Sequence, residues 1–168
     1  REDGCYNKKT GRKIAACMPM HTFGFPVHLD GLLIVCNRWK IPLVEDAAES
    51  LGSEYKGKPT GSFGEVGVFS FNGNKIVTSG GGGAITTKNI ELGERAKFLT
   101  TTAKEPHSYE YVHNELGYNF RMPNLNAALA CAQLEKLDLY LNKKRILAMN
   151  YEKFFFSKGI KFRTETKN

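Results

Sequence analysis

The first third of the chain alternates between short apolar runs and an amphipathic stretch. Residues 14–20 form an apolar run after a basic turn, and residues 41–44 form a second run. Short continuous apolar runs are typical of strands that are buried in a parallel sheet. Between the two runs, residues 28–39 place leucines and a cysteine at helical spacing, with Asp30 in the first turn, where an acid suits the helix dipole. This order predicts a strand–helix–strand unit with a right-handed crossover.

The pattern changes in the middle of the chain. Residues 52–67 are rich in Gly, Lys and Ser, which predicts a long surface loop with room for a short hairpin. Apolar runs at residues 66–71 and 84–87 predict two further strands, and a run of glycines at residues 80–83 lies between them.

Helical periodicity returns in the last part of the chain. It covers residues 89–101 and, more strongly, residues 123–141, and it continues in some form to residue 156. Residues 102–119 are polar and irregular. The whole pattern predicts an α/β fold with a mostly parallel sheet that is flanked by helices.

Composition narrows the classes of partner. The net charge of +7 favours anionic partners such as phosphates, nucleotides or nucleic acid. The basic residues cluster at Lys8, Lys9, Arg12 and Lys13, and again at Lys143, Lys144 and Arg145. Neither cluster is interleaved with aromatic residues as in proteins that bind single strands, so we do not expect nucleic acid as a partner. No apolar run approaches the ~20 residues that a membrane-spanning helix needs, so we expect no membrane partner and a cytoplasmic location.

Cysteine and histidine spacing gives no sign of a metal site. The four cysteines include no C-x-x-C pair, and we expect free thiols in a reducing compartment. The four histidines include no pair at i, i+4 spacing, so we predict no metal. The chain begins without Met and ends without a terminating motif, so we expect a piece of a longer protein.

Candidate chemistry begins with an acid, a serine and a lysine near predicted strand ends. Asp46 follows the run at residues 41–44, Ser70 lies in the next predicted strand, and Lys75 follows five residues later, shortly before the glycine run. Taken alone, Asp46 could be a helix cap, Lys75 a solvated turn lysine and the glycine run a flexible loop. The glycines lack the spacing of a Walker A loop or of a dinucleotide fingerprint.

Taken together, these features resemble the DegT/DnrJ/EryC1/StrS family of sugar aminotransferases. The matching blocks come in the family's order over about residues 18–137, and they are VEDAAESLG (44–52), GSFG (61–64), VFSFNGNK (68–75) with GGG (81–83), and LGYNFRM (116–122). The resemblance implies the large domain of a fold type I transferase that depends on pyridoxal 5′-phosphate. It places residues 1–137 in part of that domain, and residues 138–168 in a long helix and the start of a truncated small domain.

The resemblance also assigns roles to the candidate residues. Lys75 would form the Schiff base with the cofactor and move protons, as an amine of this kind does in such enzymes. Asp46 would keep the pyridine nitrogen protonated, and Ser70 would bind the cofactor phosphate. Asn119 would reach the cofactor phosphate of the other subunit, which implies a homodimer.

Three further residues are left with open roles. Arg121 is a candidate ligand for a substrate carboxylate or phosphate, or a member of a structural salt bridge. His21 is a candidate active-site histidine that binds substrate, or a satisfied core or surface histidine. Glu49 stands where the family usually has a glutamine that contacts the cofactor ring oxygen, and it would either pair with a protonated group or be a neutral acid.

The function that the resemblance implies is amino transfer. An amino-acid donor, glutamate by resemblance, would supply the amino group to a keto group of a nucleotide-linked sugar. Relatives that dehydrate sugars carry histidine in place of the lysine, so Lys75 argues against that reaction. The remaining alternatives are a catalytically incomplete fragment and a basic α/β domain that binds phosphate or nucleic acid.

Overall fold

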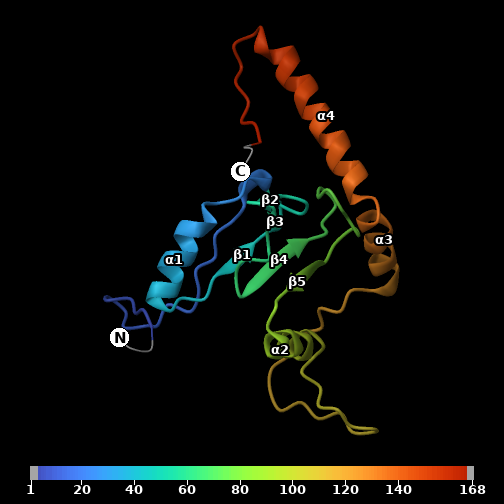
Figure 1. Ribbon diagram of the computed structural model, residues 1–168. Coiled ribbons are helices and arrows are strands. Elements are labelled where there is room, and N and C mark those ends of the chain that lie inside the picture. Colours follow the sequence, from blue (N-terminus) through green and yellow to red (C-terminus); the bar gives the residue numbers. More distant parts are fainter. Residues whose placement is uncertain (1–3, 166–168) are drawn as a thin grey trace.

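A small mixed sheet lies at the centre of the molecule, with helices around it (Figure 1). The computed structural model describes residues 4–165. The sheet has the order β1-β4-β5, with β1 at Val44–Asp46, β4 at Val66–Ser70 and β5 at Gly83–Thr86. β1 pairs with β4 in parallel, and β4 pairs with β5 in antiparallel orientation. The predicted α/β class is confirmed, with a sheet of mixed direction.

The first predicted strand is not a strand of this sheet. Residues 14–20 contribute only two isolated parallel bridges, Cys17 to Leu43 and Met20 to Asp46. Met18 is 68% exposed and Met20 is 46% exposed, so the expectation of a buried strand was wrong. Cys17 is the residue of this segment that packs against the buried cluster of Leu29, Cys36 and Leu43.

The helix of the first unit begins and ends where local signals place it. Helix α1 spans Leu29–Trp39, and the His28 ring caps it by accepting a hydrogen bond from the Gly31 amide. Leu29 and Cys36 pack with Leu43 in one of the two buried clusters. β1 starts later than predicted, because Pro42 has no N–H to donate to a ladder.

The long surface loop contains the short hairpin for which the sequence left room. β2 (Glu54–Tyr55) pairs antiparallel with β3 (Lys58–Pro59). The two residues between them, Lys56 and Gly57, both have positive φ, at 52° and 74°. This is the turn geometry that suits the twist of a two-residue hairpin.

The C-terminal half of the chain is helical. Helix α2 spans Ile90–Thr100, α3 spans Asn124–Leu134 and α4 spans Leu137–Phe156, so the periodic stretch at residues 123–156 is divided in two. α3 packs on the turn after β4 through Ala130, which joins Phe71 and Val77 in the second buried cluster. α4 extends away from the sheet (Figure 1), and no helix among residues 4–165 is long and apolar enough to cross a membrane.

The proposed domain division stays a prediction. The predicted boundary between residues 137 and 138 falls at the start of α4, whose described residues include none that are buried. The ends of both predicted parts, residues 1–3 and 166–168, lie outside the described residues.

Candidate functional site

Lys75 lies in the turn that follows β4. Its amide donates to the Asn72 carbonyl at 3.0 Å, which fixes the backbone of the turn. The side chain is only 17% exposed, and its ammonium Nζ lies 3.8 Å from Oε1 of Glu49. The lysine is therefore largely shielded and faces a carboxylate, unlike a solvated turn lysine.

Glu49 is held between Lys75 and a short 3-10 turn. That turn, η1, spans Thr22–Gly24. The second carboxylate oxygen of Glu49, Oε2, accepts a hydrogen bond from the Phe23 amide at 2.8 Å. Of the two roles that the sequence left open, the geometry favours pairing with a protonated group.

Asp46 and Ser70 share one face of the sheet. Asp46 is paired in register with Val68, and Ser70 follows Val68 by two residues on β4, so the side chains of all three lie on the same side. Asp46 Oδ1 accepts from the Ala48 amide at 3.1 Å, and Oδ2 has no hydrogen-bond partner among the described residues. Ser70 Oγ accepts from the Asn72 amide at 3.3 Å.

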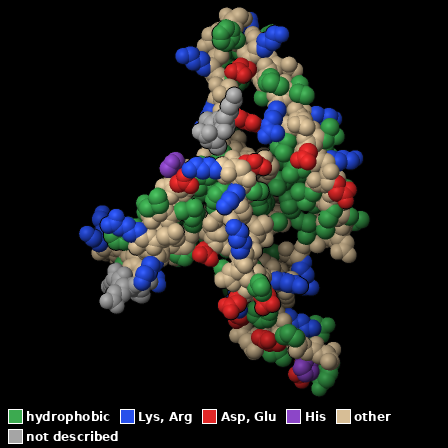
Figure 2. All heavy atoms as spheres, viewed as in Figure 1, with side chains coloured by type: hydrophobic (Ala, Val, Ile, Leu, Met, Phe, Trp, Pro, Cys, Tyr) green, Lys and Arg blue, Asp and Glu red, His purple; other side chains and the backbone are tan. Residues whose placement is uncertain are grey.

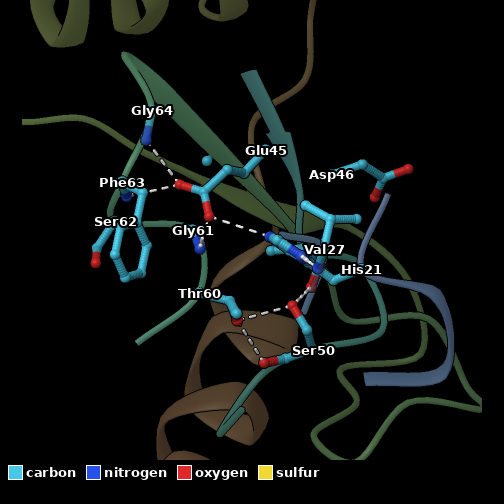
Figure 3. Close-up of polar contacts among 12 residues, drawn as sticks. His21, Val27, Glu45, Asp46, Ser50, Thr60, Gly61, Ser62, Phe63 and Gly64 are labelled. Atoms are coloured by element: carbon cyan, nitrogen blue, oxygen red, sulfur yellow. Dashed lines mark hydrogen bonds and ion pairs between the residues drawn. The ribbon is translucent and has the colours of Figure 1, made fainter. Parts of the chain in front are cut away.

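Glu45 projects to the opposite face, into a buried polar network (Figure 3). Its side chain is fully buried and accepts four hydrogen bonds. The donors are the amides of Gly61 at 2.8 Å, Phe63 at 2.6 Å and Gly64 at 2.8 Å, and the His21 ring at 3.1 Å. In the same view the Asp46 carboxylate points away from this network, as strand alternation requires.

These hydrogen bonds decide the charge of Glu45. Burial by itself raises the pKa of the Glu45 carboxyl, because a charge is costly to remove from water. The hydrogen bonds from His21 and from the Gly64, Gly61 and Phe63 amides outweigh burial, and the pKa of Glu45 lies below its usual value. We therefore expect an ionised Glu45 at neutral pH.

His21 uses both ring nitrogens inside the protein. Nδ1 accepts from the Val27 amide at 3.2 Å, so the ring proton is on Nε2, which donates to Glu45. The residue is fully buried. The geometry thus favours the satisfied core histidine over a substrate ligand, and it offers no group of His21 to a substrate.

Arg121 lies beside the glycine run, and Asn119 is its hydrogen-bond partner. Both are exposed, and Arg121 Nε donates to Asn119 Oδ1 at 3.4 Å. Arg121 lines a hollow of about 820 Å³ together with Gly80–Gly83 and residues of β4, β5, α2 and α3. Arg121 forms no ion pair among residues 4–165, which leaves its guanidinium available to an anion. The roles of Asn119 and Arg121 stay predictions.

The glycine run makes a tight return from Lys75 to β5. Gly80 and Gly82 have φ of 80° and 84°, which side chains rarely adopt. A Cβ on Gly83 would lie 2.3 Å from the Phe69 carbonyl oxygen. Glycine is therefore required here by backbone conformation and by close approach.

Glu45 is the residue of this site that the sequence did not single out. Two adjacent carboxylates on one strand must face opposite sides of a sheet, and that alternation was the available signal. The block at residues 61–64 was visible as a motif, but its role as a set of amide donors for Glu45 was not.

Comparisons with known proteins point to one family of aminotransferases. A sequence model of the DegT/DnrJ/EryC1/StrS aminotransferase family matches residues 6–168. The chain is 41% identical over 145 residues to a putative pyridoxal phosphate-dependent aminotransferase, EpsN, of Bacillus subtilis (strain 168). The matched region covers 86% of this chain and 37% of the relative. It is 37% identical over 146 residues to a GDP-perosamine synthase of Escherichia coli O157:H7. This match covers 87% of this chain and 40% of the relative.

A solved structure shares the fold. Helicobacter pylori PseC, an aminotransferase involved in the biosynthesis of pseudoaminic acid, superposes with a TM-score of 0.81 at 29% identity. The match covers 84% of this chain and 38% of PseC. The chain thus spans about 37–40% of the length of these relatives.

Proposed function

The chain belongs to the DegT/DnrJ/EryC1/StrS aminotransferase family, and on that premise we propose that the whole protein transfers an amino group to a keto group of a nucleotide-linked sugar, with pyridoxal 5′-phosphate as cofactor. The observation that carries the proposal is the shielded Lys75 opposite Glu49. Asp46 and Ser70 support it, because they lie on one face of the adjoining strands. Ligands of open α/β sheets bind at the carboxyl ends of strands, where these residues are found.

The residues present fit the cofactor. Asp46 has one carboxylate oxygen without a partner among the described residues, which suits a protonated ring nitrogen. Ser70 Oγ accepts one hydrogen bond and keeps its own proton for donation to a phosphate. Lys75 has a shielded amine that would hold the cofactor covalently. When bound, the cofactor supplies the electron sink for the reaction.

The chain's own groups would then manage charge and protons. The Asp46 carboxylate favours the protonated form of any nitrogen that it faces, because opposite charges stabilise each other at short range. Lys75 Nζ would move a proton at the substrate carbon as a general base and acid. Glu49 would hold the lysine ammonium in place, since its other oxygen is fixed by the Phe23 amide.

Substrate, partner and location are parts of the same proposal. The name of the E. coli relative refers to a GDP-linked sugar, which supports a nucleotide-linked substrate. We propose glutamate as the amino donor and Arg121 as a ligand for an anionic group of either substrate. A cytoplasmic homodimer, in which Asn119 reaches the partner's cofactor phosphate, completes the proposal.

The other reactions receive less support. Lys75 is present, which argues against sugar dehydration as seen in relatives that carry histidine there. Lys and Arg side chains are spread over several elements of the visible face rather than gathered in one patch (Figure 2), which does not favour a nucleic-acid surface.

The test uses the full-length protein loaded with pyridoxal 5′-phosphate. The loaded protein is supplied with glutamate and a panel of nucleotide-linked keto sugars. Mass spectrometry then measures the aminated sugar and 2-oxoglutarate. Lys75→Arg keeps the positive charge but removes the reactive primary amine, so the rate falls by at least about 10²-fold. The matched control is Lys58→Arg in the exposed strand β3, which keeps the wild-type rate. Wild-type turnover by Lys75→Arg would overturn the proposal.

A further inference from the structure

We propose that His21 and Glu45 form a buried positioning pair, which holds the η1 turn, and through it the Glu49 carboxylate, against Lys75. The importance of the pair for catalysis rests on the proposed function. The contacts themselves can be measured without it. Neither residue is placed in contact with substrate or cofactor, so both act through Glu49.

The pair is fixed by hydrogen bonds on every side. Glu45 Oε2 accepts from His21 Nε2 at 3.1 Å and from the Gly61 amide at 2.8 Å, while Oε1 accepts from the Phe63 and Gly64 amides. Hydrogen bonds to an ionised carboxylate are stronger than those between neutral groups. Because both side chains are fully buried, a movement of either one would leave donors unpaired away from water.

His21 also contacts the backbone at both ends of the η1 turn that follows it. Its amide donates to the Asp46 carbonyl at 3.0 Å, which ties it to the end of β1. Its carbonyl accepts from the Gly24 amide at 3.1 Å, which closes the η1 turn. Its ring accepts from the Val27 amide at 3.2 Å, just before α1. The backbone and the side chain of His21 are therefore both fixed by hydrogen bonds.

Inside the turn, the Phe25 amide donates to the Thr22 carbonyl at 3.1 Å, and none of the three residues of the turn is buried. Phe23 adopts φ of 54°, an uncommon conformation for a residue with a side chain, and the residue is 82% exposed. Packing of the ring therefore does not explain the conformation. The Phe23 amide nevertheless points at Glu49 Oε2, at 2.8 Å. Contacts at the two ends of the turn maintain that direction, and His21 provides one end.

The last contact reaches the lysine. Glu49 Oε1 lies 3.8 Å from Lys75 Nζ. The sequence of contacts runs from Glu45 to His21, along the η1 backbone to the Phe23 amide, and from there to Glu49 and Lys75. If His21 loses its hold on the turn, the Phe23 amide no longer fixes Glu49, and the carboxylate swings towards solvent.

The test uses the full-length protein and has two readouts, one for the η1 turn and one for Lys75. Hydrogen–deuterium exchange of the Phe23 amide is followed without cofactor in wild type, His21→Leu and His21→Gln. His21→Leu speeds exchange about tenfold, as loss of a hydrogen bond to a charged acceptor implies. His21→Gln keeps exchange closer to wild type, because its amide nitrogen can donate to Glu45 as Nε2 does. If His21→Leu does not fold, His21→Asn replaces it, because it keeps an acceptor for Val27 but not the donor to Glu45.

The second readout is the initial rate at which pyridoxal 5′-phosphate and borohydride modify Lys75. We expect this rate to fall several-fold in His21→Leu and to recover in His21→Gln. The matched control is Thr60→Val, which removes the buried hydroxyl that bonds to Ser50 at 2.8 Å and leaves both residues of the pair intact. This control keeps both readouts at the wild-type level.

Three results would overturn the inference. The first is wild-type exchange at Phe23 in His21→Leu or its replacement. The second is faster exchange without any change in Lys75 modification. The third is an equal change of both readouts in Thr60→Val, which would make the pair merely structural. Failure of the proposed function is separate, because it would appear as no Lys75 modification in wild type while the exchange of Phe23 still responds to His21.

Discussion

Two neighbouring carboxylates, Glu45 and Asp46, differ in their surroundings because they lie on opposite faces of one strand. Glu45 is buried and accepts four hydrogen bonds, while Asp46 accepts one and keeps an oxygen free among the described residues. The first is suited to hold backbone in place, and the second is suited to meet a ligand. A one-residue shift of β1 would exchange the two roles.

Glu45→Gln tests the structural role of the buried carboxylate. At pH 7 we expect the free energy of unfolding to fall by about 3 kcal/mol, because the amide NH₂ cannot accept from the surrounding N–H groups. Urea denaturation measures the change. The control Glu54→Gln alters an exposed side chain of β2 and is expected to change stability by less than about 0.5 kcal/mol.

The difference in the free energy of unfolding between wild type and Glu45→Gln depends on pH in a defined direction. The pKa of Glu45 in the folded protein lies below its usual value of 4.5, so the folded state binds fewer protons there than the unfolded state. Its stabilising contribution is therefore fully present above pH 4.5 and is lost as the pH falls through the folded pKa. The difference in the free energy of unfolding between wild type and Glu45→Gln should therefore become smaller as the pH falls below 4.5. A difference that stays constant down to acid unfolding would contradict the account.

Sequence reasoning located these residues unevenly. Lys75, Asp46 and Ser70 lie in ordered blocks, and the structure places them at one end of β1 and β4. The amide donors of Glu45 come 16 to 19 residues later in the chain and His21 lies 24 residues earlier, so nothing local identifies that residue. His21 had two interpretations, and only its three-dimensional partners distinguish them.

At the scale of elements, β4 can take the centre of the sheet because Gly67 has no side chain. A Cβ there would lie 2.2 Å from the Gly61 carbonyl oxygen and 2.6 Å from Thr86 Oγ1. The Thr86 hydroxyl donates to that same carbonyl at 2.8 Å. Close contact between β4 and the loop at residues 61–64 thus presents the amides of the loop to Glu45.

Gly67→Ala should therefore disturb more than one strand. We expect it to lower the free energy of unfolding by about 3 kcal/mol, because the backbone oxygen in its way cannot move like a flexible side chain. Gly73→Ala is the matched control, since a Cβ there meets no atom within 4 Å, and we expect a change below about 1 kcal/mol. Thermal unfolding compares them, and equal effects of both substitutions would refute the packing argument.

Elements with local end signals were predicted best. The ends of α1 and α2 match the sequence pattern within a residue or two, and side chains of His28 and Asn89 cap them. The run at residues 14–20 failed as a buried strand because burial depends on a neighbouring strand, which no local pattern encodes. The division between α3 and α4 at residues 135–136 contains neither Gly nor Pro, so no local signal predicts it.

At the scale of the whole molecule, large apolar side chains remain open to solvent. Leu125 on α3 is 87% exposed and Leu129 is 46% exposed, and apolar atoms gather over that side of the molecule (Figure 2). Arg121 lines the hollow beside the glycine run, and its guanidinium donates to Asn119. The chain spans about 37–40% of its relatives, so the complete pocket, the homodimer and the small domain beginning at residue 138 are parts of the proposal.

The most direct test of the central claim is chemical trapping of the cofactor on the full-length protein. The protein is loaded with pyridoxal 5′-phosphate, reduced with borohydride, digested and mapped by mass spectrometry. We predict one dominant adduct, on the peptide that contains Lys75, and its absence in Lys75→Arg. An adduct confined to other lysines, or no adduct in a fully folded and loaded wild-type protein, would contradict it.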